Sequence, residues 1–161
     1  MRFVPYEYQR YCTEYIKTHP IAALFLDMGL GKTVITLSAI KDLMLETFEV
    51  SKVLIIAPLR VARDTWPAEI EKWDHLKGLD ISVIVGDVKT RIAAVHHPAM
   101  IYIVNRENIR WLVEYYEKNG MRCGLQHMAR ILRERRSDRY GGYQKHPGGA
   151  EVLLPVLCLE I

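Results

Sequence analysis

The stretch LFLDMGLGKT, residues 24–33, decides the fold. It closes an apolar run, IAALFL (21–26), which is typical of a strand buried on both faces of a sheet. Two glycines, a lysine and a threonine follow, and residues 32–48 then show the apolar spacing of a helix. A strand, a glycine turn and a helix in this order predict a phosphate-binding loop. The glycines let backbone amides turn inward, and the positive end of the helix faces the anion.

The side chains of this loop suit a nucleotide with its metal ion. Lys32 offers a cation to the β- and γ-phosphates, and the Thr33 hydroxyl can hold Mg²⁺, so both are candidate catalytic residues and Thr33 is the candidate metal ligand. The pattern is G-x-G-K-T, because Leu26 stands where the longer P-loop pattern has its first glycine. The other candidate ATP contacts in the loop are Met28, Gly29, Leu30, Gly31 and Val34.

The rest of the pattern alternates strands with helices. Further strands are predicted at 52–58, 81–85 and 100–104, and helices at 6–18, 59–73, 88–95 and 107–116. Pro67 should kink or restart its helix, and Pro155 makes the apolar run 152–161 a poor central strand. The alternation predicts an α/β fold, with a parallel sheet and helices on both faces.

Charge and composition narrow the class of protein. The net charge of the 161 residues is +3, and residues 117–149 hold eight basic and three acidic side chains, which makes this segment basic. No apolar stretch reaches the roughly 20 residues that span a bilayer, so we expect no membrane partner. The N-terminus turns polar too soon for a signal peptide. Three cysteines fit no metal or redox spacing, as expected of free thiols in a cytoplasmic protein: Cys12, Cys123 and Cys158.

Several motifs resemble one family in order and spacing. DMGLGKT (27–33) resembles motif I of the SNF2-like group of superfamily 2, DEAD/DEAH-type, helicases and translocases, in wording closest to phage and prophage members. Tyr8-Gln9 stands before it, as the family's adenine-contacting glutamine does. VLIIAPLRVARDTWPAEIEKW (53–73) looks like motif Ia and its sequel, and IYIVNRENI (101–109) is similar to the strand and turn that reach DNA. The resemblance covers about residues 3–116.

The resemblance implies a RecA-like P-loop lobe with ATP and Mg²⁺ as cofactors and DNA as partner. Gln9 would contact adenine, although a helical glutamine is ordinarily solvated. Tyr6 or Phe3 would stack on the base or belong to the core, and Trp66 and Trp73 fit core or interlobe packing better than DNA stacking. Four residues follow strand ends at one edge of the sheet, where they would contact phosphates: Arg60, Arg63, Asn105 and Arg106. For Arg60 and Arg63 the alternative is that they are solvated helix charges.

The sequence lacks one motif that hydrolysis uses in this family. An Asp-Glu-x-His strand end would hold Mg²⁺ and orient the attacking water, and a second lobe would supply arginine fingers. Residues 117–161 contain no such motif, since Asp138 follows no strand and Glu160 lacks a preceding aspartate. We therefore expect 1–117 to be the N-terminal part of the lobe and 118–161 a basic tail without assignment. A truncated or frameshifted copy, or a chain whose end was replaced, would read this way.

Taken together, these observations predict the ATP-binding lobe of an SNF2-like DNA helicase or translocase, weak or inactive in hydrolysis by itself. Two alternatives remain open at this stage. One is a non-enzymatic nucleic-acid-binding or regulatory fragment that uses the basic tail. The other is an unrelated P-loop kinase, which would have no use for Pro58, Trp66 and Trp73 in this order.

Overall fold

A parallel sheet forms the centre of the computed structural model, which describes residues 1–19, 21–119 and 155–157. Its strands are β1 (Val53–Ala57), β2 (Ile81–Ile84), β3 (Ile101–Asn105) and β4 (Pro155–Leu157), in the order β2-β3-β1-β4. Val53 lies opposite Ile101, and Leu54 lies opposite Pro155. All pairs are parallel, which confirms the predicted α/β fold.

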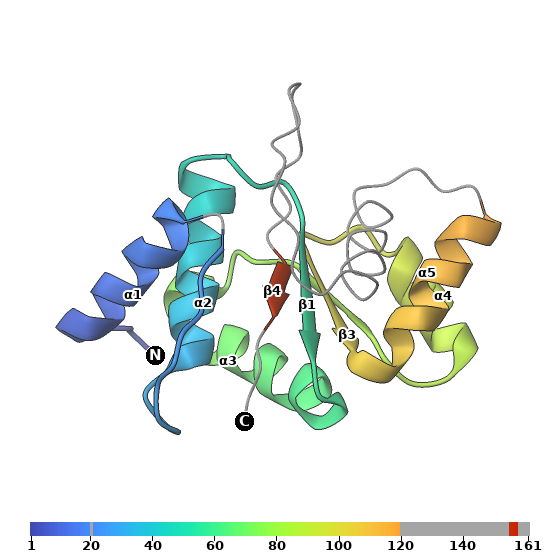
Figure 1. Ribbon diagram of the computed structural model, residues 1–161, viewed down its shortest axis with the longest axis horizontal. Helices are drawn as coiled ribbons and strands as arrows, with labels where there is room; N and C mark the ends of the chain where they lie inside the picture. The colour runs from blue at the N-terminus through green and yellow to red at the C-terminus, as the bar shows by residue number, and fades with distance from the viewer. Residues whose placement is uncertain (20, 120–154, 158–161) are drawn as a thin grey trace.

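Helices cover both faces of this sheet (Figure 1). The elements are α1 (Glu7–Thr18), α2 (Lys32–Lys41), α3 (Trp66–Lys72), α4 (Val88–His96) and α5 (Ile109–Lys118). The odd-numbered residues of β1 pack against α2 and α3, and its even-numbered residues pack against α4 and α5. The helix α1 packs on α2 through a smaller cluster that contains Cys12, Ile16, Ile35 and Ala39. Two apolar layers therefore hold the sheet between its helices.

Short irregular helices complete the connections. π-helical turns extend α2 as η1 (Asp42–Glu46) and precede α3 as η2 (Val61–Thr65). Turns of 3₁₀ helix follow α3 as η3 (Asp74–Leu76) and precede α5 as η4 (Arg106–Asn108). Pro67 lies in the first turn of α3, directly after η2, so the helix changes from the π to the α pattern near the position where a kink or restart was predicted, without a break in the helix.

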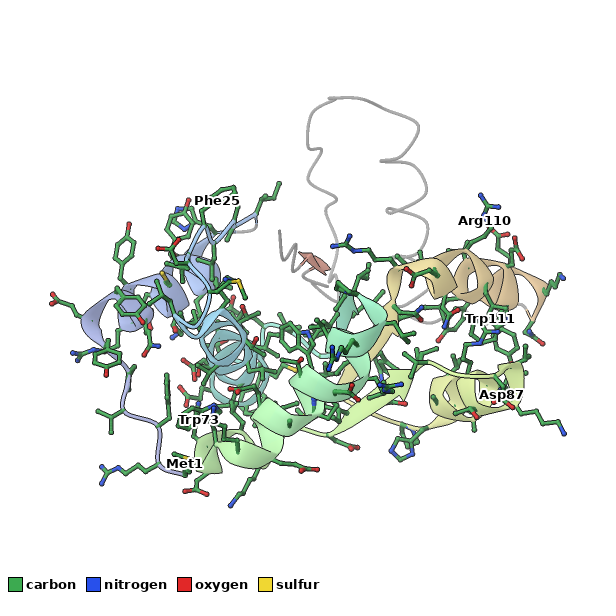
Figure 2. The ribbon with its side chains drawn as sticks, turned by 90° about the horizontal axis from the view of Figure 1, so that it is seen from below. Met1, Phe25, Trp73, Asp87, Arg110 and Trp111 are labelled. Carbon is green, nitrogen blue, oxygen red and sulfur yellow. The ribbon has the colours of Figure 1, made fainter. Side chains whose placement is uncertain are left out.

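The strand predicted for residues 21–26 is wrong. This segment has no strand assignment, and its side chains differ in burial. Leu24 and Leu26 pack against the α1–α2 cluster, whereas the side chain of Phe25 is 89% exposed. Figure 2 shows Phe25 at the periphery, on the side of α1 and away from the strands. The described sheet ends at β4, so no described strand gives this segment the ladder that a two-sided strand requires.

The second half of the predicted tail is described only in part. Pro155 begins β4, which is an edge strand of the described sheet and agrees with the expectation that this run is a poor central strand. Asp138 and Glu160 lie outside the described residues, as does most of 118–161. Among the residues that are described, no helix combines the length and the hydropathy needed to cross a membrane.

Candidate nucleotide and nucleic-acid site

Three segments lie at the end of the molecule where the strands of the parallel sheet have their carboxyl ends. The glycine loop before α2, the segment after β1 and the segment after β3 all lie at the lower end of the molecule in Figure 1. Each strand of a parallel sheet ends at this edge, and α/β proteins bind their ligands there. The fold thus brings the predicted nucleotide residues and the predicted DNA contacts to the same edge.

The glycine loop has the backbone conformation that its sequence predicts. Gly29 and Gly31 have φ values of 84° and 81°, in the left-handed region that favours glycine. Gly31 is the N-cap of α2, and no side chain caps this helix. The first backbone amides of α2 therefore have no side-chain acceptor, which is the arrangement that binds an anion at a helix N-terminus.

Lys32 lies folded over its own loop. Its Nζ donates hydrogen bonds to the carbonyl oxygens of Leu26 (2.9 Å) and Asp27 (3.2 Å). Both acceptors are neutral, so an anionic phosphate oxygen would be a stronger partner for the same ammonium group. The lysine is consequently close to the loop and able to exchange these carbonyls for phosphate.

Thr33 differs from the next threonine of the helix. The Thr36 hydroxyl donates to the Lys32 carbonyl (2.9 Å), whereas the Thr33 hydroxyl forms no hydrogen bond with the described residues. An unengaged hydroxyl at this position suits a Mg²⁺ ligand. Within residues 1–19, 21–119 and 155–157, no three His, Cys, Asp or Glu side chains gather as a protein metal site would require.

Gln9 links α1 to the glycine loop. It is buried, its Oε1 accepts the Tyr6 backbone N–H (3.0 Å), and its Nε2 donates to the Leu30 carbonyl (3.3 Å). The Tyr8 hydroxyl donates to the same carbonyl (3.2 Å). A Cβ atom on Gly31 would lie only 2.8 Å from Gln9 Nε2. Gln9 is therefore a packed contact of the loop and not a solvated helix residue.

The two candidate stacking residues have different surroundings. Phe3 packs edge-on against Trp73, with ring centroids 5.2 Å apart, and stacks on His75 at 5.0 Å. Tyr6 is 70% exposed and lies parallel to Tyr8 at 6.0 Å. Phe3 thus belongs to the packing between the N-terminus and α3, and Tyr6 presents the more accessible ring.

The remaining loop residues divide between surface and core. The Met28 side chain is 90% exposed, and Leu30 is partly exposed beside it. Val34 is buried in the core between α2 and the sheet. Val34 can meet a nucleotide only through its backbone amide, whereas Met28 can contribute its side chain.

The arginines that follow β1 are both exposed, but they differ in their partners. Arg63 forms a two-bond ion pair with the neighbouring Asp64, Nε to Oδ1 at 2.8 Å and Nη2 to Oδ2 at 3.0 Å. Arg60 forms no hydrogen bond or ion pair with a described residue. The hydrogen bond from Arg63 lowers the pKa of Asp64, and the charge of Arg60 lowers it further. A single carboxylate therefore sits close to both cations.

The two predicted contacts at the end of β3 also differ in their surroundings. Asn105 lies opposite Ala57 in the ladder and is buried, and its Nδ2 donates to Glu107 Oε2 at 2.6 Å. The Asn105 Oδ1 atom is buried without a hydrogen-bond partner among the described residues. Arg106 is exposed. Of the two predicted contacts, Arg106 is accessible to a phosphate and Asn105 lies beneath the surface of the edge.

Both tryptophans of the motif Ia-like segment serve packing. Trp66 is 1% exposed and belongs to the core between α2, α3 and the sheet. The Trp73 indole N–H donates to Glu69 Oε2 (2.7 Å), and Lys72 lies over its ring. This outcome agrees with the preference for packing over DNA stacking.

The sequence did not single out two features of the site. One is the hydrogen bond from the Tyr8 hydroxyl to the loop, which no local sequence pattern predicts. The other is Asp64, for which a signal existed: it stands four residues after Arg60 and directly after Arg63, and helical residues four apart lie on one face.

Comparisons with known proteins match this chain to one family and to one phage protein. The family described as SNF2-related domain matches residues 11–132, which extends past residue 116, where the recognised motifs end. Protein p41 of Acyrthosiphon pisum secondary endosymbiont phage 1 is 39% identical over 113 residues, which cover 70% of this chain and 25% of p41. The chain therefore spans about a quarter of the length of this curated relative.

Proposed function

Because this chain belongs to the SNF2-related domain family, we propose that it is the ATP-binding lobe of a DNA helicase or translocase. Its glycine loop would bind Mg-ATP, and its carboxyl edge would bind DNA phosphates. The α/β architecture is that of a partial RecA-like lobe, and the family is ATP-dependent. The chain covers a quarter of p41, so the activity of a whole protein is part of the proposal.

The observation that carries the proposal is the geometry of the glycine loop. Gly29 and Gly31 are left-handed, α2 begins without a side-chain cap, and the Lys32 ammonium lies over the loop at hydrogen-bond distance from two carbonyls. These are the three elements of an anion cradle: turned amides, a helix N-terminus and a cation. A glycine turn without a ligand role would need neither the uncapped helix N-terminus nor the lysine.

Nucleotide binding would use groups that have spare hydrogen-bonding capacity. A primary amide has two N–H donors and two acceptor lone pairs, and the contacts of Gln9 in the structure use one of each. Gln9 can therefore meet an adenine edge without leaving the loop. Mg²⁺ bound with ATP would neutralise phosphate charge, and the Thr33 hydroxyl would serve as its ligand.

DNA binding would use the exposed cations of the same edge. Arg60, Arg63 and Arg106 follow β1 and β3, whose ends lie side by side because Ala57 pairs with Asn105. Contacts of arginine with phosphates position a nucleic acid without reading its sequence. We accordingly expect binding that depends strongly on salt and weakly on base sequence.

A nucleotide titration tests the first part of this proposal. Lys32→Ala should weaken binding of fluorescent Mg-ATP by about 1.5–3 kcal/mol, since a charge-assisted contact to phosphate is lost. Lys77→Ala is a matched control, because it removes an exposed lysine that pairs with Asp74 away from the loop. Both variants should keep the far-ultraviolet circular dichroism of the parent. Equal affinity of Lys32→Ala and parent would refute the nucleotide site.

A second candidate function is DNA binding without any role for nucleotide. The excess of basic side chains in residues 117–149 favours it, because a basic segment binds nucleic acid non-specifically. In that case DNA affinity would be the same with and without Mg-ATP and would be unchanged in Lys32→Ala. Coupling between the two ligands, lost in Lys32→Ala, would favour the translocase lobe.

A further inference from the structure

The segment after β1 contains one carboxylate among its arginines. Asp64 is the residue following Arg63 and stands four positions after Arg60, within and just before the π-helical turn η2. Residues four apart on a helix lie on one face, whereas adjacent residues do not face each other. The Arg63 side chain nevertheless donates two hydrogen bonds to the carboxylate of Asp64.

The contact occupies the group that DNA binding would need. An arginine fork recognises carboxylates and phosphates in the same bidentate way, through two parallel N–H donors. Asp64 holds Nε and Nη2 of Arg63 at 2.8 and 3.0 Å, so these donors cannot meet a phosphate until the carboxylate leaves. The contact of Arg60 with Asp64 is electrostatic only, and its own donors remain unused by described residues.

The exposure of the pair makes an exchange of partners feasible. The Arg63 and Asp64 side chains are 59% and 51% exposed, and neither belongs to a core cluster. Exposed ion pairs contribute little to folding stability, so the pair is not required to hold η2 in place. A DNA phosphate can therefore approach Arg63 from solvent and compete with Asp64 for it.

We propose that Asp64 is an internal competitor of DNA for Arg63, and that it thereby lowers the affinity and the salt dependence of DNA binding at this edge. The inference rests on the proposed function, because it assumes that the edge binds phosphates. With Asp64 in place, Arg63 provides less than one full phosphate contact and Arg60 provides a complete one. Removing the carboxylate charge releases the fork of Arg63.

A double-mutant cycle with Asp64→Asn and Arg63→Ala measures the competition. Asparagine keeps the shape of aspartate and removes its charge. Asp64→Asn should raise affinity for a fluorescein-labelled DNA oligonucleotide about two- to fivefold at low salt, in line with the small strength of exposed ion pairs. The slope of log K against log salt should steepen by up to about 0.7–0.9, the value for one whole phosphate contact, because the contact of Arg63 becomes complete.

Asp80→Asn controls for the change in net charge. Asp80 is exposed and lies just before β2, at the amino edge of the sheet and therefore opposite the proposed DNA edge. In the Arg63→Ala background, Asp64→Asn should produce no more than the effect of Asp80→Asn. An equal gain with and without Arg63, or a gain no larger than that of Asp80→Asn, overturns the competition.

A second measurement separates this inference from the proposed function. The Arg63 Nε–H resonance, observed by NMR while inorganic phosphate is added, should shift at lower phosphate concentration in Asp64→Asn than in the parent. An identical phosphate titration in the parent and in Asp64→Asn overturns the competition, regardless of the result of the DNA-binding measurement. If phosphate titrates as expected but neither the parent nor Asp64→Asn binds DNA, Asp64 competes for Arg63 with inorganic phosphate alone, and the proposed DNA binding at this edge fails.

Discussion

Gly31 combines two constraints in one residue. Its φ of 81° lies where residues with a Cβ are strained, and the space that a Cβ would fill is occupied by Gln9 Nε2 at 2.8 Å and Val34 Cγ1 at 3.2 Å. Gly29 shares the first constraint, with φ 84°, but a Cβ there would meet no atom within 4 Å. A comparison of the two glycines therefore distinguishes the effect of backbone strain, which both share, from the effect of close packing, which applies to Gly31.

We predict that Gly31→Ala destabilises the chain more than Gly29→Ala does. The left-handed conformation alone costs a residue with a Cβ about 1–2 kcal/mol, which both variants should lose. Gly31→Ala should lose more, because Gln9 must also move and its bond to the Leu30 carbonyl is disturbed. Urea unfolding of the two variants and the parent measures the difference. Equal losses would show that Gln9 yields without cost.

The sequence indicated which residues form the candidate site more readily than it indicated their contacts in the structure. Lys32, Thr33 and the two glycines follow from spacing alone, because a phosphate cradle needs those residue types in that order. The topology then places the arginines at the carboxyl edge. The burial of Asn105 and the bond between Arg63 and Asp64 depend on side-chain packing around each strand end, for which the sequence carries no periodic signal.

At the scale of elements, apolar runs predicted the strands that have neighbours. The runs at β1 and β3 are buried throughout and pair with each other, as their composition indicates. The run at 21–26 has the same composition and no described ladder partner, and so it is not a strand. Periodicity reports how a segment would be buried, but pairing depends on a second segment elsewhere in the chain.

One polar link between elements joins Ser38 on α2 to His75 in η3. The Ser38 hydroxyl lies 2.8 Å from the Val34 carbonyl and 2.9 Å from His75 Nε2, so when its proton is donated to the carbonyl, the Nε2–H tautomer of His75 donates to Ser38. The Nδ1 atom of His75 then carries the lone pair, and it is buried without a partner among the described residues. Burial lowers the pKa of His75, and the charge of Lys41 lowers it further, against smaller opposite effects of Asp42 and Asp74.

This link predicts a loss of stability at mildly acidic pH. The ordinary pKa of histidine is about 6.5, so below that pH the unfolded chain binds a proton that the folded chain, with its lowered pKa, does not yet bind. Stability should therefore be full above about pH 6.5 and fall as the pH drops towards the folded-state pKa of His75. Urea unfolding between pH 5 and 7.5 follows this change.

The matched variants for this pH test are His75→Gln and His97→Gln. Glutamine at position 75 retains an amide donor for Ser38 but does not titrate, so its stability should vary less between pH 5 and 7.5. His97 is exposed, and its substitution should leave the pH dependence of the parent intact. An unchanged slope in His75→Gln would assign the acid sensitivity to other groups.

At the scale of the whole molecule, the described residues provide the proposed nucleotide cradle and part of the proposed DNA edge. They come from a chain that spans a quarter of p41, and residues 117–161 hold no Asp-Glu-x-His sequence. Binding and turnover make different demands on such a chain. Binding needs the amides, the lysine and the hydroxyl of the glycine loop, whereas turnover also needs an oriented water and stabilisation of the transferring phosphate.

We predict that the purified 161-residue chain binds Mg-ATP weakly and hydrolyses it near background. An arginine finger alone is worth about 10³–10⁵ in kcat in P-loop enzymes, and a positioned general base contributes about 10²–10⁴. These factors need not multiply, but a chain without either should retain little activity, while Gly29, Gly31 and Lys32 still support binding. The measurement is phosphate release with and without DNA, compared with Lys32→Ala. Turnover that depends on Lys32 would contradict the prediction and show that a carboxylate in 117–161 acts on the water, with Glu160 the first residue to substitute.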